Sequence, residues 1–195
     1  GVTGVAWANP IMPLVVLDSS NWATYYNISQ AITYAADRGV KVINISIGGS
    51  SSSSTLQNAV NYAWHKGAII FASAMNNASS TPYYPAACKN VVAVSATTSS
   101  DTLAGFSNYG PTIAVAAPGA SILSSTKDGG YQAWSGTSMA SPHVAGAVAL
   151  IWSAYPALKG QLLETERLLE DTATPEKSVQ DCGGVSGSTV PSADT

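Results

Sequence analysis

A serine at position 138 has the neighbours that a nucleophile needs. It lies in the stretch GTSMASPHVAG, where Gly136 allows a tight turn and small side chains surround the hydroxyl. A long apolar helical run begins here, and the free N–H groups and dipole of a helix N-terminus favour developing negative charge. The pattern indicates acyl transfer through Ser138; the alternative is a serine that only caps the helix.

A serine nucleophile needs a base, and the chain has two histidines, His65 and His143. His143 follows Ser138 by five residues, which places it about 140° around the helix and out of reach. We expect it to be a packed helix residue with a hydrogen-bonded ring. His65 ends a helix that leads into the amino end of a strand, which is the wrong edge of a sheet. The stretch also approaches the nucleophile elbow of α/β-hydrolases, but that fold needs a later histidine and only His143 follows.

Two further stretches could complete a site for acyl transfer. In ASAMNNASS, residues 72–80, an asparagine just beyond a buried strand could direct its amide at an oxyanion. Asn76 and Asn77 are equivalent on this local argument, and either could instead be a turn residue. In NISIGGS, residues 44–50, an exposed strand end could pair with an extended peptide or could be a flexible strand terminus.

Helical and strand patterns alternate along the chain and must position these residues. The spacing of apolar residues predicts helices over 27–39, 54–67, 134–152 and 160–173. Apolar and β-branched runs predict strands over 40–49, 68–75, 90–98, 112–119 and 121–126, after a first apolar run at 13–18. This alternation predicts an α/β fold with a mostly parallel sheet covered on both faces. We expect the functional residues beyond the carboxyl ends of its strands, and a poorly ordered polar tail over 174–195.

The composition excludes several classes of protein. Only 10% of the residues are charged, the net charge is −3 and there is no basic run, so neither nucleic acid nor a membrane surface is an expected partner. No apolar stretch reaches the roughly 18 residues of a membrane span, and we identify no signal peptide. Cys88 and Cys182 form either one disulfide or two separate thiols, and no spacing suggests a metal cluster. The low charge favours a secreted protein.

The serine stretch resembles, almost letter for letter, the serine motif of subtilisin-like serine peptidases, the subtilases. The resemblance continues through FSNYGPTIAVAAPGASILSS, YYPAACKNVVAVSAT, FASAMNNAS and INISIGG, in the family's order, over about residues 1–173. It implies a three-layer α/β/α fold, Ser138 as the nucleophile and Asn76 as the oxyanion donor. It also implies two segments that flank the substrate, Ser46, Ile47 and Gly48, which pair with its backbone, and Ser73, Ala74 and Met75.

The sequence departs from the family pattern in three places. The family's aspartate motif and its His-Gly-Thr-His-like motif do not occur, and GVTGVAW, residues 1–7, resembles the segment after the histidine helix. We therefore expect a partial domain over 1–173 without the triad Asp and His, without the loop of the family's tight calcium site, and with no cofactor. Met75 replaces a usual glycine and would crowd the primary specificity pocket. The tail CGGVSGSTVPSADT does not match the usual end of the domain.

Three functions are compatible with these residues. The chain is part of a serine peptidase, a weak hydrolase of activated esters that works without the full triad, or a non-catalytic module that keeps the scaffold for binding or assembly. The resemblance favours the peptidase, with a peptide or small ester as substrate and an extracellular location. A parallel sheet without its first strands exposes an apolar edge, so we expect the isolated chain to self-associate.

Overall fold

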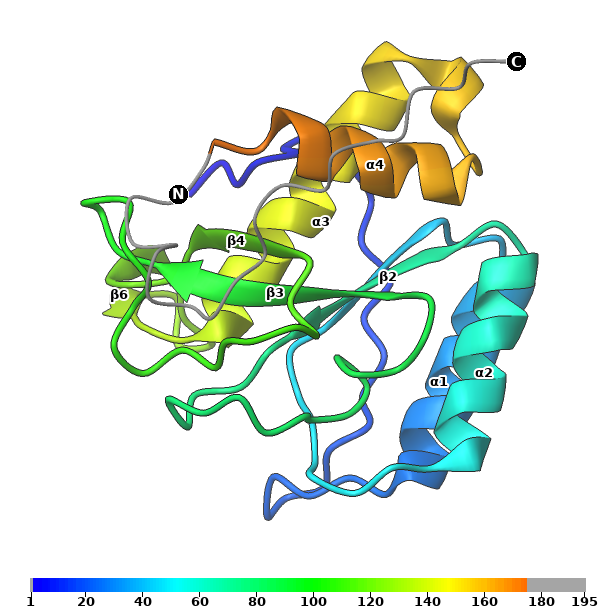
Figure 1. Ribbon diagram of the computed structural model, residues 1–195, viewed down its shortest axis with the longest axis horizontal. Coiled ribbons are helices and arrows are strands. Elements are labelled where there is room, and N and C mark those ends of the chain that lie inside the picture. The colour runs from blue at the N-terminus through cyan, green and yellow to red at the C-terminus, as the bar shows by residue number, and fades with distance from the viewer. Residues whose placement is uncertain (1, 175–195) are drawn as a thin grey trace, which may run out of the picture.

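Four parallel strands form the central sheet, in the order β1-β2-β3-β4 (Figure 1). They are β1 Val42–Ile45, β2 Ile69–Ser73, β3 Val91–Thr97 and β4 Val115–Pro118. The computed structural model describes residues 2–174. Two further strands, β5 Ile122–Ser125 and β6 Tyr131–Trp134, pair antiparallel as a separate hairpin.

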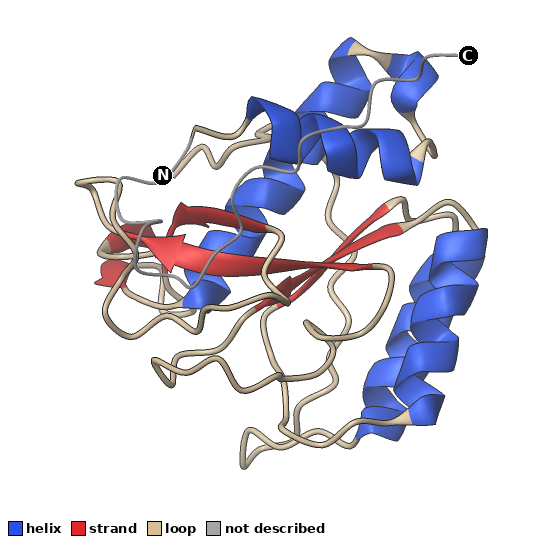
Figure 2. Ribbon diagram, in the orientation of Figure 1, coloured by secondary structure: helices blue, strands red, loops and turns tan. Residues whose placement is uncertain are grey.

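Helices cover both faces of this sheet (Figure 2). Helices α1 Tyr25–Asp37 and α2 Ser54–His65 pack on one face, and α3 Thr137–Ala154 packs on the other, followed by the short 3₁₀ helix Pro156–Leu158 and by α4 Leu162–Thr172. Alternate residues of β2 serve the two cores, because Ile70 contributes to the core under α1 and α2 while Phe71 contributes to the core under α3. The expected three-layer α/β/α fold with a parallel sheet is therefore confirmed. Within the described residues, none of these helices has the length and apolar character to cross a bilayer.

The expected helices and strands are present, with two differences. Strand β6 was not expected, and because it ends at Trp134 the long helix begins at Thr137 rather than at the start of the run 134–152. The apolar run 13–18 forms no strand, and it includes Val15, which is 92% exposed. Of the tail expected at 174–195, everything from residue 175 onward lies outside the described residues.

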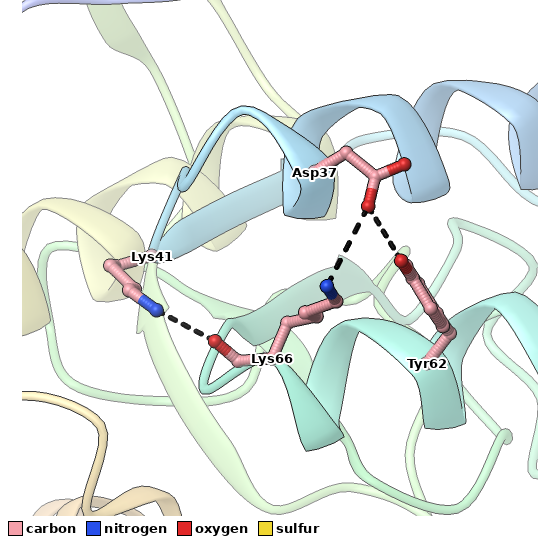
Figure 3. A network of polar contacts seen from close by, with 4 residues as sticks. All are labelled: Asp37, Lys41, Tyr62 and Lys66. Atoms are coloured by element: carbon pink, nitrogen blue, oxygen red, sulfur yellow. Dashed lines mark hydrogen bonds and ion pairs between the residues drawn. The ribbon is translucent and has the colours of Figure 1, made fainter.

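A small polar network joins α1, α2 and β1 at the amino edge of the sheet (Figure 3). The Tyr62 hydroxyl donates to the Asp37 carboxylate, and the Lys66 ammonium lies 3.9 Å from the same oxygen. Lys41 Nζ donates to the backbone carbonyl of Lys66 at 2.6 Å. The Lys66–Asp37 pair is about half exposed, so its contribution to stability is on the order of 0–1 kcal/mol. The network holds helices in place at the edge opposite the candidate site.

A large hollow lies beside the outer strand β1. It has a volume of about 1450 Å³, and its walls come from residues 2–17, α1, β1 and α3. The extended segment 2–17 crosses it loosely, since Trp7 is 75% exposed and Ile11 is 86% exposed. Among residues 2–174, apolar side chains and an unpaired edge of β1 thus face solvent together.

We expect the isolated chain to self-associate through this hollow, because burying exposed apolar surface and an open strand edge is favourable. Light scattering over a wide concentration range should give a mass above that of one chain. Val15→Lys should shift the population toward the monomer, whereas Leu163→Lys, at an exposed leucine on α4, should not. A wild-type chain that stays monomeric throughout would contradict this expectation.

Candidate active site

The candidate residues gather at the carboxyl edge of the sheet. Ser46 follows β1, Asn76 follows β2, and Ser138 is the second residue of α3, which crosses the sheet from this edge. Parallel strands bring their carboxyl ends to one edge, and α3 begins there. Three segments far apart in sequence thus supply one site.

Ser138 is not the N-cap of α3. Gly136 occupies that position, and a glycine has no side chain with which to cap the helix. The Ser138 hydroxyl instead donates to the backbone carbonyl of Ser46 at 3.2 Å, and the side chain is only partly buried. The residue is partly exposed and lies in the first turn of a helix, and within residues 2–174 no base is bonded to its hydroxyl. This arrangement presents the oxygen but does not deprotonate it.

A proline within α3 allows a second bond between β1 and the nucleophile segment. Pro142 has no N–H, so it cannot donate to the Ser138 carbonyl four residues earlier. The Ser46 hydroxyl donates to that carbonyl at 3.0 Å. Ser46 and Ser138 therefore exchange two hydrogen bonds, and the strand end is fixed against the start of α3.

The Asn76 amide is oriented by Thr137, the residue before Ser138. Asn76 Oδ1 accepts from the Thr137 N–H at 2.8 Å and from the Thr137 hydroxyl at 3.0 Å. Because both partners are donors, the oxygen of the amide is identified and Nδ2 points elsewhere. A β-carbon on Gly136 would lie 3.3 Å from Nδ2, so this donor lies beside the turn that carries Ser138. Within the described residues no hydrogen bond is recorded for Nδ2, and an N–H of this kind next to a partly exposed serine can stabilise an oxyanion.

Asn77 has a different environment. Its backbone N–H donates to Asn108 Oδ1 at 2.8 Å, and within the described residues its exposed side chain has no hydrogen bond to the nucleophile segment. Sequence alone left Asn76 and Asn77 equivalent by local pattern. The structure brings only Asn76 to Ser138, through Thr137.

The two segments expected to flank a substrate lie next to one another. Sheet pairing ends at Ile45, and Gly49 forms an isolated antiparallel bridge with Tyr84, so the backbone of Ser46, Ile47 and Gly48 lies outside the ladder. Unpaired backbone of this kind can accept an extended peptide. On the other side, Ser73 and Ala74 are buried, and the Ala74 N–H is already bonded to Val94.

Met75 fills the space between these segments. A β-carbon on Gly48 would lie 3.2 Å from Met75 Sδ, so the thioether packs directly against that glycine. Met75 has a φ of +80°, in the left-handed region, which costs an L-residue with a side chain about 1–2 kcal/mol. The side chain narrows the gap between the two segments.

Neither histidine approaches Ser138. His143 Nδ1 lies 2.8 Å from the Met139 carbonyl, and since a carbonyl only accepts, this nitrogen carries the proton. His65 Nδ1 lies 2.6 Å from the Asn61 carbonyl at the end of α2, and that end leads into the amino end of β2. Both rings are held by their own helices, which was expected for His143, and His65 lies at the end of a helix as expected.

Cys88 does not contribute to the site. Burial raises the pKa of its thiol to about 11, so it is protonated and a poor nucleophile at neutral pH. It forms no disulfide within residues 2–174, and its possible partner Cys182 lies outside the described part of the chain. The choice between one disulfide and two thiols therefore stays open.

Sequence reasoning missed three polar residues that build the site. Thr137, which is fully buried, links Asn76 to the Met75 N–H, and Ser141 donates to Asn44 at 2.7 Å. Asn44 donates in turn to the Ser46 hydroxyl at 3.1 Å. The alternation of Asn44 and Ser46 on one face of a strand was the available signal, but their partners on α3 were not readable from it.

Comparison with known proteins identifies the family of this chain. The model of the subtilase family matches residues 1–186. The chain is 49% identical over 153 residues to a thermophilic serine proteinase of Bacillus sp. (strain AK1), covering 78% of this chain and 38% of that protein. It is 40% identical over an alignment of 214 positions to an extracellular protease of Xanthomonas campestris pv. campestris, covering all of this chain and 36% of that protein.

A solved protease structure is also similar to this chain. The chain superposes with a TM-score of 0.83 on a protease from Pseudoalteromonas arctica PAMC 21717, at 33% identity, covering 89% of this chain and 58% of that one. The chain thus spans well under two thirds of each of these proteins. With the family model matched over nearly its whole length, this chain belongs to the subtilase family of serine peptidases.

Proposed function

We propose that this chain supplies the nucleophile and the oxyanion donor of a serine peptidase. Ser138 Oγ attacks the carbonyl carbon of a peptide or ester and loses its proton to water or to a base from outside the described chain, and Asn76 Nδ2 donates to the carbonyl oxygen as it becomes negative. The amine or alcohol leaves as acyl-Ser138 forms. Water then hydrolyses this ester, which releases the acid and returns a proton to Ser138. The observation that carries this proposal is the pair of hydrogen bonds from Thr137 to Asn76 Oδ1, because they leave Nδ2 free beside Ser138.

For the chain by itself we propose a weaker reaction, the hydrolysis of activated esters. The Ser138 hydroxyl donates to a backbone carbonyl and both histidines are bonded to their own helices, so no group on the described chain removes its proton. An amine leaves only when it is protonated by a general acid, whereas a nitrophenolate leaves unaided. A serine and an oxyanion donor retain part of the rate without the rest of a triad.

A sulfonyl fluoride tests the proposed nucleophile directly. Phenylmethanesulfonyl fluoride should label Ser138 of the isolated chain, slowly but in preference to the many other serines. Peptide mapping by mass spectrometry locates the adduct, and Ser138→Ala should remain unlabelled. Equal labelling of several exposed serines, or none, would contradict the proposal.

Replacing Met75 with glycine should widen the primary specificity pocket. The thioether that packs on Gly48 is removed, and a backbone at φ +80° becomes unstrained, so the variant should fold at least as well. We expect the rate of Ser138 labelling by phenylmethanesulfonyl fluoride, relative to the smaller methanesulfonyl fluoride, to rise roughly tenfold or more. The two rate constants are measured by mass spectrometry of the intact chain.

Met12→Gly provides the matched control, because Met12 lies in the segment 2–17 and lines the hollow instead. Its ratio of labelling rates should equal that of the wild-type chain. An unchanged ratio in Met75→Gly as well would mean that Met75 does not limit the pocket.

Three further features of the function concern the location of the protein, its cofactors and its partners. We propose an extracellular peptidase, supported by the low charge of the chain and by a relative named for its extracellular location. We propose that the chemistry uses no cofactor, because serine acyl transfer needs only protein groups. Nucleic acid is not a proposed partner, in keeping with the net charge of −3.

A further inference from the structure

The loop that carries Asn76 has a backbone that needs external support. This oxyanion loop, residues 75–79, contains two non-glycine residues in the left-handed region, Met75 at φ +80° and Ala78 at φ +48°. Conformations of this kind persist when surrounding contacts determine them. The position of the Asn76 amide therefore depends on whatever holds the loop.

Residues 106–109 form that support. The Ala78 N–H donates to the Phe106 carbonyl at 2.9 Å, and the Asn108 N–H donates to the Met75 carbonyl at 3.0 Å. The Tyr109 N–H donates to the Ser79 carbonyl at 3.1 Å. Both ends of the oxyanion loop are thus bonded to one short segment.

The side-chain hydrogen bonds from the supporting segment to the loop come from Asn108. Asn108 Oδ1 accepts from the N–H of Asn77 at 2.8 Å, immediately after the oxyanion donor, and more distantly from the N–H of Ser79 at 3.4 Å. Because both partners are donors, the oxygen of this amide is assigned without ambiguity. Its acceptor atom bonds the residue next to Asn76.

Asn108 is itself rigidly held. It is 2% exposed, and its carbonyl accepts from the hydroxyls of Ser95, in β3, and Ser107, at 2.9 and 3.0 Å. Its Nδ2 is buried and has no partner among the described residues, which is unfavourable for an amide. The side chain of Asn108 therefore bonds through its oxygen alone among the described residues. Through this oxygen and its backbone carbonyl, Asn108 connects the oxyanion loop to β3.

We propose that Asn108 is a positioning residue for the oxyanion donor. Its Oδ1 fixes the backbone at Asn77 so that the amide of Asn76 is directed beside Ser138. The inference rests on the proposed function of Asn76. A merely structural amide would stabilise the whole fold without any specific effect on this loop.

Two variants of Asn108 separate these roles. Asn108→Leu keeps the size and removes the acceptor, whereas Asn108→Asp keeps an oxygen in the same place. In Asn108→Leu we expect backbone hydrogen exchange at Asn77 and Ser79, measured by NMR, to become roughly tenfold faster than in wild type. The exchange rates in β3 should change only as far as the stability of the whole fold changes. The side-chain amide resonance of Asn76 should shift, and labelling of Ser138 by phenylmethanesulfonyl fluoride should slow by a similar factor.

Asn108→Asp should restore the exchange rates and the Asn76 resonance. Asn61→Leu is the matched control, because Asn61 Oδ1 also accepts two hydrogen bonds, from Gln57 and Asn90, but lies on α2. It should leave the loop unchanged. If Asn108→Leu does not fold, Asn108→Ser, which is too short to reach Asn77, replaces it.

The proposal is overturned if exchange at Asn77 and the Asn76 resonance are unchanged in Asn108→Leu, or if Asn61→Leu changes them equally. Failure of the proposed function gives a different result. In that case wild-type Ser138 is not labelled, while exchange and the Asn76 resonance still report whether Asn108 positions the loop.

Discussion

Replacing Ser138 with alanine should reduce ester hydrolysis by the isolated chain to the rate of buffer. The Ser138 hydroxyl is accessible in the first turn of α3, and its removal leaves the oxyanion donor without an acyl acceptor. The hydroxyl makes one bond, to the Ser46 carbonyl, so the variant should lose at most about 1 kcal/mol of stability. Release of nitrophenol from a short-chain nitrophenyl ester measures the effect.

Ser135→Ala is the control for this prediction. It is the same substitution three residues earlier, at an exposed serine whose hydroxyl accepts from the Ser121 N–H. Its ester turnover should equal that of wild type. Equal turnover in Ser138→Ala and in wild type would remove both catalytic functions from this chain and favour a binding or assembly module.

Peptide hydrolysis should separate the two catalytic alternatives in the same assay. With ester turnover present, we expect no measurable cleavage of a peptide anilide by the chain alone, because neither His65 nor His143 can protonate the leaving amine. Cleavage of the anilide that depends on Ser138 would show that a base reaches the site from elsewhere.

The second large effect is expected at Asn76. Removing one oxyanion donor in a subtilisin costs about 10²–10³ in kcat, and we expect a loss of that order in ester turnover for Asn76→Ala. The variant also leaves the buried Thr137 hydroxyl and N–H without their acceptor, so it should unfold at a somewhat lower temperature. Ester kinetics and thermal unfolding, measured on the same preparation, distinguish the two effects.

Two further variants test whether the loss at Asn76 is specific. Asn77→Ala, at the neighbouring exposed side chain, should keep wild-type turnover. Thr137→Val keeps the shape of Thr137 but removes the hydroxyl that bonds to Asn76 Oδ1 and to the Met75 N–H. Its ester turnover should therefore lie between those of Asn76→Ala and Asn77→Ala. A loss in Asn77→Ala as large as in Asn76→Ala would contradict the assignment of the donor.

The sequence by itself determined the family and the class of fold, and it predicted Ser138 as the nucleophile. A helix that packs on a sheet buries one face, and this burial produces the apolar spacing seen in 27–39 and 54–67. The structure has α1 and α2 at these two places. The helical geometry at His143 also sufficed to exclude it as a base, because five residues along a helix fix the direction of a side chain. The local sequence pattern was informative for properties that depend on a single helix or strand.

Tertiary structure decided what depends on contacts between elements. Asn76 and Asn77 have the same local sequence context, so the local pattern does not distinguish them; the resemblance chose Asn76, and the contact with Thr137, 61 residues later, belongs to Asn76 alone among the described residues. The run 13–18 is as apolar as a strand but lies along an open hollow and forms none, since a strand also requires backbone pairing with a neighbour, which the apolar pattern does not encode. The support from Asn108 was equally unreadable, because it joins segments 31 residues apart. Hydrogen bonds between distant segments leave no periodicity in the sequence, and at this site they hold Ser46, Asn76 and the start of α3 together.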